Sequence, residues 1–236
     1  MLAGLACAQM MIEWSWITLG GRRAPLYIAP LALLMLIAPF VAWIWGPAAA
    51  LVVIVPAILW AMLSRFVGNP SGPLDGFGVA YIGAAGVALV ALRDLEPFGF
   101  LTIIWAVLVV IAADVGGYFA GRTIGGPKLW PAVSPKKTWA GLLGGIGLAV
   151  CVAVIFSWQT TGTWFYEVCT VSAVAALLAQ IGDLGESALK RRFDVKDAGS
   201  LIPGHGGVLD RLDGHMIAIL VAAAVTFWRE KPVFIW

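Results

Sequence analysis

Long apolar runs set the strongest limit on what this chain can fold into. Leu26–Trp45 and Ala48–Trp60 contain almost only hydrophobic residues, and a helix needs about 20 apolar residues to span a bilayer. The chain of 236 residues is 61% hydrophobic and 12% charged, whereas soluble domains are about 45–50% apolar and about 25% charged. One soluble core of this size cannot bury so much apolar surface. We therefore predict an all-α fold, a polytopic transmembrane helical bundle.

Eight apolar segments are expected to form the helices of this bundle. They cover residues 1–19, 26–46, 48–66, 76–93, 99–120, 138–157, 167–189 and 214–229. Glycine and proline mark most of the joins. We predict one integral membrane domain over 1–236, with hydrophobic N-terminal helices at 1–97 and the helices and loops of a polar site at 98–236. The first segment begins without a charged leader and contains Glu13, so we expect relatives to have a ninth helix before it.

The basic residues predict the orientation of the helices. Lysine and arginine near helix ends favour the cytoplasm. Of the 15 such residues, four lie in the loop at 121–137 and five in the loop at 190–213. Both loops would then be cytoplasmic, and the uncharged loop at 158–166 would lie outside. The charges of the two basic loops could converge on one site.

The helix that leads into the second basic loop carries a polar stripe. Asp183, Ser187 and Lys190 are spaced i, i+4, i+7, so they share one helical face. A carboxylate inside an apolar span is costly and usually functional. For Glu186, a helix end in water with Lys190 as its ion-pair partner is an alternative explanation.

A glycine-rich turn at 203–207 follows, and Asp210 and Asp213 come directly after it. Such a turn can bring backbone N–H groups close to a phosphate, and His205 within it could donate to phosphate or transfer a proton. The two aspartates are spaced i, i+3 and could face one cation. Oxygen ligands without cysteine suit Mg²⁺. Asp213 could equally serve to complement the helix dipole.

The first basic loop contains two lysines within Ser134–Thr138, at the start of a helix. Lysine side chains and helix N-termini both favour phosphate, although an anchor for lipid headgroups explains the charge as well. Asp114, in the preceding helix, would either line the site or pair with Arg122. The GxxxG step at 141–145 predicts close helix packing.

These residues together favour transfer between phosphate groups at a membrane surface, where a protein mainly positions reactants and neutralises charge. Two other functions compete. A polyprenol kinase would need the same cations and metal ligands. A transporter or channel would have intramembrane charges scattered over several helices, whereas here only Asp114 and Asp183 are expected at depth and the other charges are expected to cluster on one face.

The stretch Ser187–Asp213 resembles, without gaps over 27 residues, the signature of the phosphatidate cytidylyltransferases, also called CDP-diacylglycerol synthases. "SPKKT" at 134–138 and "DVGGYFAGRTIG" at 114–125 resemble two further blocks of that family. The resemblance implies that CTP and phosphatidate react to CDP-diacylglycerol and pyrophosphate, with Mg²⁺ as cofactor. Ala140 departs from the glutamate that many relatives carry there, so no role is assigned to this position.

The resemblance and the chemistry of the residues give the candidate site. The catalytic candidates are Lys190, Arg191, His205, Asp210, Arg211 and Asp213; the substrate-binding candidates are Ser187, Lys196, Lys136, Lys137, Arg122, Asp114, Gly206 and Gly207; the metal ligands are Asp183 and Asp210. The expected partners are CTP and the lipid phosphatidate, with no nucleic acid and with a homodimer as an open alternative. The expected location is a bacterial cytoplasmic membrane, with the site facing the cytoplasm.

Overall fold

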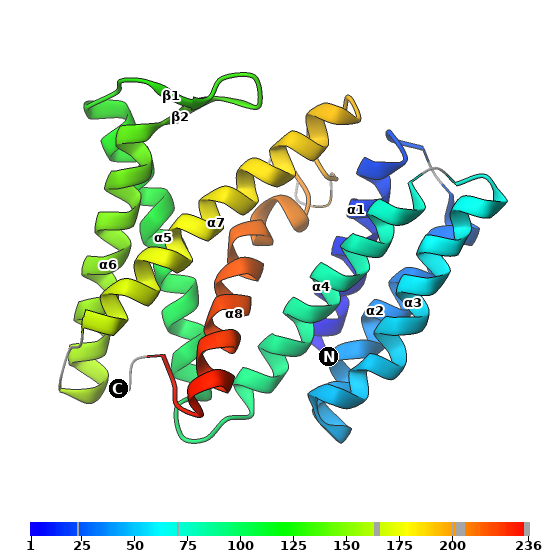
Figure 1. Ribbon diagram of the computed structural model, residues 1–236, viewed down its shortest axis with the longest axis horizontal. Coiled ribbons are helices and arrows are strands. Elements are labelled where there is room, and N and C mark those ends of the chain that lie inside the picture. Colours follow the sequence, from blue (N-terminus) through cyan, green and yellow to red (C-terminus); the bar gives the residue numbers. More distant parts are fainter. Residues whose placement is uncertain (23, 70, 163–165, 200, 202–205, 234–236) are drawn as a thin grey trace. The chain divides into compact units, whose positions relative to one another are not determined.

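The computed structural model describes residues 1–22, 24–69, 71–162, 166–199, 201 and 206–233 (Figure 1). The α-helices in this part of the chain are α1 (Leu2–Thr18), α2 (Pro25–Trp45), α3 (Leu51–Leu63), α4 (Gly72–Arg93), α5 (Gly99–Thr123), α6 (Trp139–Thr161), α7 (Tyr166–Arg192) and α8 (Leu209–Arg229). Short 3₁₀ helices, η1 (Pro47–Ala50) and η2 (Ser64–Val67), extend α3 at its two ends. Each predicted apolar segment thus corresponds to a helix, and the helical bundle is confirmed.

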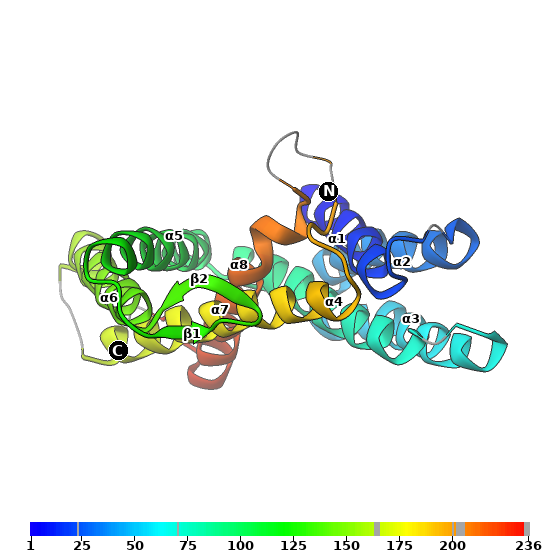
Figure 2. The same cartoon turned by 90° about the horizontal axis from the view of Figure 1, so that it is seen from above.

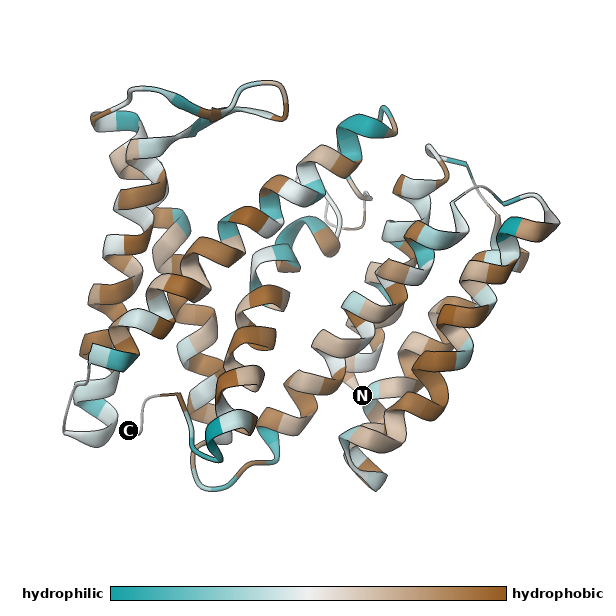
Figure 3. Cartoon of the chain, in the orientation of Figure 1, coloured by the Kyte–Doolittle hydropathy of each residue, from teal (hydrophilic) through white to brown (hydrophobic). Residues whose placement is uncertain are grey.

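Seven of the described helical segments are long and apolar enough to cross a membrane. Hydrophobic residues run along the helices, and hydrophilic residues gather near many of their ends (Figure 3). Helix α1 is apolar but has 17 residues, which at 1.5 Å per residue make about 26 Å, less than the ~30 Å hydrocarbon core. The chain is therefore an integral membrane protein with several spans.

The chain forms two compact units, which are described separately. The first comprises Met1–Asp94 and Leu189–Leu212, and the second comprises Leu95–Ala188 and Asp213–Trp236. The prediction of one domain over 1–236 with a division near residue 97 stays a prediction.

In the first unit, α4 packs against α1 through glycines that leave no room for a side chain. A Cβ atom on Gly78 would lie 2.4 Å from the Trp14 ring, and one on Gly86 would lie 2.4 Å from the Cys7 sulfur. Asp75, in the first turn of α4, is fully buried. Its carboxylate accepts hydrogen bonds from Thr18 at 2.6 Å, Tyr27 at 2.8 Å and Ser71 at 3.1 Å. These hydrogen bonds offset the free-energy cost of burying the carboxylate.

In the second unit, α5 and α6 pack closely along facing glycines. A Cβ atom on Gly145 would lie 2.5 Å from the carbonyl oxygen of Ala113, and one on Gly116 would lie 2.7 Å from that of Gly144. Small residues permit this backbone approach, as the GxxxG step predicts. This helix pair is the support on which the first basic loop is built.

That loop contains a β-hairpin, which the sequence did not predict. Strand β1 (Lys128–Trp130) pairs antiparallel with β2 (Ser134–Thr138), and the hairpin lies at the end of α5 and α6 (Figures 1 and 2). Thr138 ends β2 and caps α6, because its hydroxyl accepts a hydrogen bond from the N–H of Gly141 at 3.0 Å. The hairpin and this cap hold the loop's two lysines at the mouth of α6.

Candidate active site

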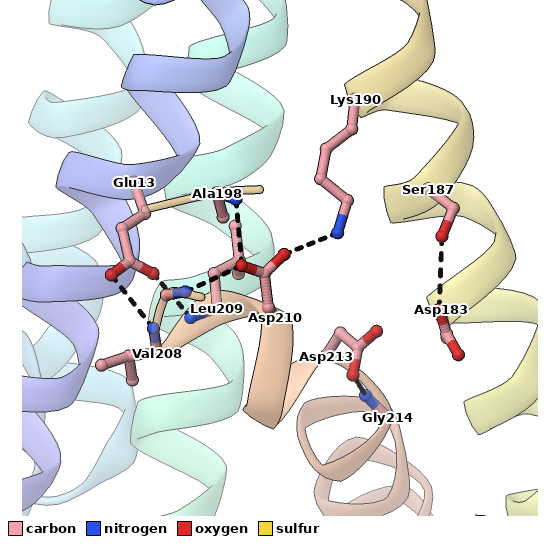
Figure 4. A network of polar contacts seen from close by, with 11 residues as sticks. Glu13, Asp183, Ser187, Lys190, Ala198, Val208, Leu209, Asp210, Asp213 and Gly214 are labelled. Atoms are coloured by element: carbon pink, nitrogen blue, oxygen red, sulfur yellow. Dashed lines mark hydrogen bonds and ion pairs between the residues drawn. The ribbon is translucent and has the colours of Figure 1, made fainter. Parts of the chain in front are cut away.

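Asp210 is a predicted site residue that three hydrogen bonds hold in place (Figure 4). It lies in the first turn of α8. Its Oδ1 accepts a hydrogen bond from Lys190 Nζ at 2.6 Å, and its Oδ2 accepts from the N–H groups of Gly207 at 2.8 Å and Ala198 at 2.9 Å. The side chains of Asp210 and Lys190 are only 13% and 14% exposed. Charge-assisted bonds of this kind fix both position and orientation.

Gly206 and Gly207, at the end of the glycine-rich turn, leave no room for side chains. Gly206 has a φ of 84°, a region that favours glycine. A Cβ atom there would lie 2.7 Å from Asp210 Oδ2, and one on Gly207 would lie 2.5 Å from Glu13 Oε2. The two glycines therefore let the backbone close around carboxylates. The predicted approach of this backbone to a phosphate stays a prediction.

Glu13 is a residue of this region that the sequence reasoning did not select. It is 2% exposed, and its carboxylate accepts hydrogen bonds from the N–H groups of Val208 at 3.0 Å and Leu209 at 2.7 Å (Figure 4). One signal could have found it. It is a carboxylate inside an otherwise apolar segment, the same property that selected Asp114 and Asp183.

Asp183 belongs to a second ion pair, which lies in the second unit. Its Oδ2 accepts a hydrogen bond from Lys137 Nζ at 2.5 Å, and its Oδ1 accepts a longer one from Ser187 at 3.4 Å. The Asp183 side chain is 37% exposed and that of Lys137 is 21% exposed. A lysine of the first basic loop thus contacts a carboxylate of α7, and the convergence of the two basic loops on one site stays a prediction.

A pocket of about 200 Å³ opens beside this pair. Its polar lining includes Lys136, Lys137, Asp114 and Gln180. The Gln180 amide donates a hydrogen bond to Asp114 Oδ1 at 2.9 Å. Two ammonium groups at one small pocket could bind a phosphate group.

The predicted alternative of an Asp114–Arg122 pair is wrong. Arg122 instead donates to the hydroxyl of Tyr118 at 2.6 Å, and its guanidinium carbon lies 5.9 Å from the centre of that ring. The physical reason is distance, since eight residues of helix separate the two charges by about 12 Å along the axis. Tyr118, four residues before Arg122, lies one turn away.

The remaining candidates are less fixed or lie outside the described residues. Arg191, Lys196 and Arg211 are exposed. Asp213 lies in the second turn of α8, where its Oδ1 accepts a hydrogen bond from the N–H of Gly214 at 2.6 Å. His205 lies outside the described residues. Their roles in binding or catalysis stay predictions.

The donor chemistry of the two aspartates fits magnesium. Among the described residues, no group of three or more His, Cys, Asp or Glu could hold a metal ion. Mg²⁺ does not require such a group, because it commonly binds one or two carboxylates together with substrate phosphates and water. Each aspartate offers carboxylate oxygens that a lysine already neutralises. To bind either aspartate, a divalent cation would therefore have to displace the lysine or share the carboxylate with it.

The sequence also matches a family model, described as the cytidylyltransferase family, over residues 1–228. The chain belongs to this family. The resemblance predicted from the signature at 187–213 is therefore confirmed. Three relatives are named phosphatidate cytidylyltransferase. The proteins of Brucella suis, Bacillus subtilis and Helicobacter pylori are 43%, 40% and 39% identical to this cytidylyltransferase family member over 157, 141 and 155 residues.

These matches cover 66%, 59% and 64% of this cytidylyltransferase family chain. They cover 56%, 52% and 58% of the relatives. The chain thus spans little more than half the length of the curated relatives it matches.

Proposed function

We propose that this protein transfers the cytidylyl group of CTP to phosphatidate, giving CDP-diacylglycerol and pyrophosphate. The observation that carries the proposal is the held Asp210–Lys190 pair, which lies within the signature of the family. The names of the relatives support the same reaction. A carboxylate and an ammonium placed together suit a reaction between two polyanions, in which charge must be both neutralised and oriented.

In this reaction a phosphate oxygen of phosphatidate attacks the α-phosphorus of CTP. A new P–O–P bond forms, the bond between the α-phosphorus and the bridging oxygen breaks, and pyrophosphate leaves with that oxygen. Lys190, Arg191 and Arg211 would hold phosphate oxygens, with Ser187 and His205 in support. Asp183 and Asp210 would hold Mg²⁺, which when bound would offset the negative charge of the triphosphate.

The two ion pairs suggest how the lysines act before substrate arrives. Lys137 and Lys190 each contact a carboxylate at 2.5–2.6 Å. Each ammonium has three N–H donors, so it can keep that contact and still donate to a phosphate. We propose that Lys137, together with Lys136 at the rim of the pocket, binds a phosphate group of one substrate.

We further propose that the site faces the cytoplasm, because the basic loops at 121–137 and 190–213 favour that side. Labelling of a cysteine introduced at Lys128 by an impermeant reagent tests this, with labelling expected only after the membrane is opened. The predicted homodimer stays a hypothesis, which the mass of the detergent-solubilised protein tests.

The test of the reaction is pyrophosphate release by the purified protein in detergent. CTP, Mg²⁺ and phosphatidate are supplied together and then omitted in turn. The proposal predicts release only when all three are present, with a CDP-lipid as product. Turnover of CTP with a polyprenol to CDP and a phosphorylated lipid would contradict it and would favour the kinase.

A further inference from the structure

The start of α8 is held by a carboxylate from a distant part of the chain. Glu13 lies in α1 and contacts Val208 and Leu209, residues 195 and 196 positions away. It lies outside the signature at 187–213. Nothing in the proposed reaction has yet required it.

Glu13 and the α8 N-terminus satisfy each other's hydrogen-bonding needs. The first N–H groups of a helix have no partner within the helix. A buried carboxylate is costly unless it is hydrogen-bonded. The carboxylate takes the N–H of Val208 at 3.0 Å and of Leu209 at 2.7 Å, and it also accepts from the Gln9 amide at 2.8 Å. The helix dipole favours a negative charge at this end.

Two backbone segments that hold Asp210 also pack on Glu13. Gly207 donates its N–H to Asp210 Oδ2 at 2.8 Å, and a Cβ atom on Gly207 would lie 2.5 Å from Glu13 Oε2. Ala198 donates to the same Oδ2 at 2.9 Å, and a Cβ atom on the next residue, Gly199, would lie 3.0 Å from Glu13 Oε1. Both backbone donors to Asp210 therefore belong to segments that contact the Glu13 side chain.

We infer that Glu13 is a positioning residue for Asp210. Its carboxylate fixes the backbone at 198–199 and at 207–209, and this backbone fixes the Asp210 carboxylate that faces Lys190. The inference rests on the proposed function for its effect on turnover. Its effect on the backbone does not depend on that reaction.

The kinetic test compares Glu13→Gln with the matched control Asp75→Asn. Gln has the size of Glu, but it presents its amide NH₂ group, itself a hydrogen-bond donor, to one of the two N–H donors. Asp75 is another fully buried carboxylate of the same unit, but it accepts hydrogen bonds from side chains that can rotate, among them the hydroxyls of Thr18, Tyr27 and Ser71. We expect Glu13→Gln to lower kcat roughly tenfold to a hundredfold, the usual effect of losing an outer partner of a functional carboxylate. The KM of Glu13→Gln for CTP should change less than its kcat. Asp75→Asn should keep kcat within about twofold of wild type, because this substitution removes no residue that supports Asp210.

The second test needs no substrate. Hydrogen–deuterium exchange of the full chain in detergent should be several-fold faster over 206–212 in Glu13→Gln than in wild type, with α4 unchanged. Gly199→Ala provides a variant that keeps the carboxylate but presses on it, and it should raise exchange in the same segment. This variant decides the matter where Glu13→Gln does not yield folded protein.

Unchanged exchange over 206–212 in these variants would overturn the inference, even if the protein proves to catalyse another reaction. Equal kcat in Glu13→Gln and wild type would overturn it for catalysis, provided that wild type makes the CDP-lipid. A fall in kcat of the same size in Asp75→Asn would also overturn it, because the effect would then reflect general stability. If wild type makes no CDP-lipid, the proposed function fails and the exchange result alone judges the positioning role.

Discussion

Asp210 and Asp183 each face a lysine from another element, yet the protein holds the two carboxylates differently. Asp210 accepts from two backbone N–H groups as well as from Lys190, and its side chain is 13% exposed. Within the part of the chain that the structure describes, Asp183 accepts from the side chains of Lys137 and Ser187, and it is 37% exposed. Backbone donors cannot rotate away, whereas a lysine chain can.

The difference suggests separate duties for the two aspartates. A group held by backbone is pre-organised, and charge that is already oriented costs no rearrangement during a reaction. A partly exposed group held by a lysine that lines a pocket can change partner when a phosphate or a cation enters. Asp210 would then fix the geometry of the site, and Asp183 would adapt to the substrate.

The largest effect is expected for Asp210→Asn. Loss of the charge should lower turnover at least about a hundredfold. Replacement of a residue that only supports a functional group lowers activity by up to about a hundredfold, and Asp210 is proposed to act in the site itself. The amide also presents N–H groups to Lys190 or to the backbone donors, and this unsatisfied burial should cost about 1–3 kcal/mol of stability. Assays of turnover and of heat-induced loss of monodisperse protein test both effects. The exposed Asp94→Asn is the control, and wild-type turnover in Asp210→Asn would refute the metal and orientation role.

Asp183→Asn should separate activity from stability. We expect turnover to fall roughly tenfold to a hundredfold. The free energy of unfolding should change by less than about 1 kcal/mol, because partly exposed ion pairs contribute little. A loss of stability equal to that of Asp210→Asn would remove the contrast between the two carboxylates.

The lysines of β2 sharpen the comparison within one strand. Successive side chains of a strand point to opposite faces, and Lys137 contacts Asp183 while the neighbouring Lys136 is exposed. Lys137→Gln should raise the KM for a phosphate substrate roughly tenfold, the contribution of one hydrogen bond to a charged group. Lys136→Gln should have a smaller effect. Equal effects in the two variants would show that general positive charge, rather than the contact with Asp183, is what matters.

The smallest effect is expected for Thr138→Ala. Its hydroxyl caps α6 at the N–H of Gly141, and loss of such a cap costs about 1 kcal/mol. Thermal unfolding in detergent should detect this loss. Thr138→Ser keeps the acceptor oxygen and is the matched control, so a similar loss in both variants would argue against the cap.

The sequence predicted the helices because the bilayer imposes one simple rule, a run of apolar residues of sufficient length. It did not predict the hairpin at 128–138. Pro135 lies within β2, and proline usually argues against a strand. A two-stranded hairpin has only edges, where proline is tolerated.

The sequence predicted which residues belong to the site better than it predicted the contacts between them. Asp210 and Lys190 stand out by type and by their place in the signature, and their pairing at 2.6 Å is a product of the fold. Glu13 was missed because no local pattern relates it to Val208, 195 residues away. The sequence signal for Glu13 was a charged residue among apolar neighbours. That signal was used to select Asp114 and Asp183 in later helices but not Glu13.

The phosphorus of CTP that reaches the lipid distinguishes cytidylyl transfer from phosphoryl transfer most directly. The measurement is the fate of label when purified protein is supplied with phosphatidate, Mg²⁺ and CTP labelled at either the α- or the γ-phosphorus. Cytidylyl transfer predicts that α-label enters the lipid fraction and that γ-label leaves as pyrophosphate, with both changes lost in Asp210→Asn. Entry of γ-label into the lipid would contradict the account, because it would mean transfer of a phosphoryl group rather than of a cytidylyl group.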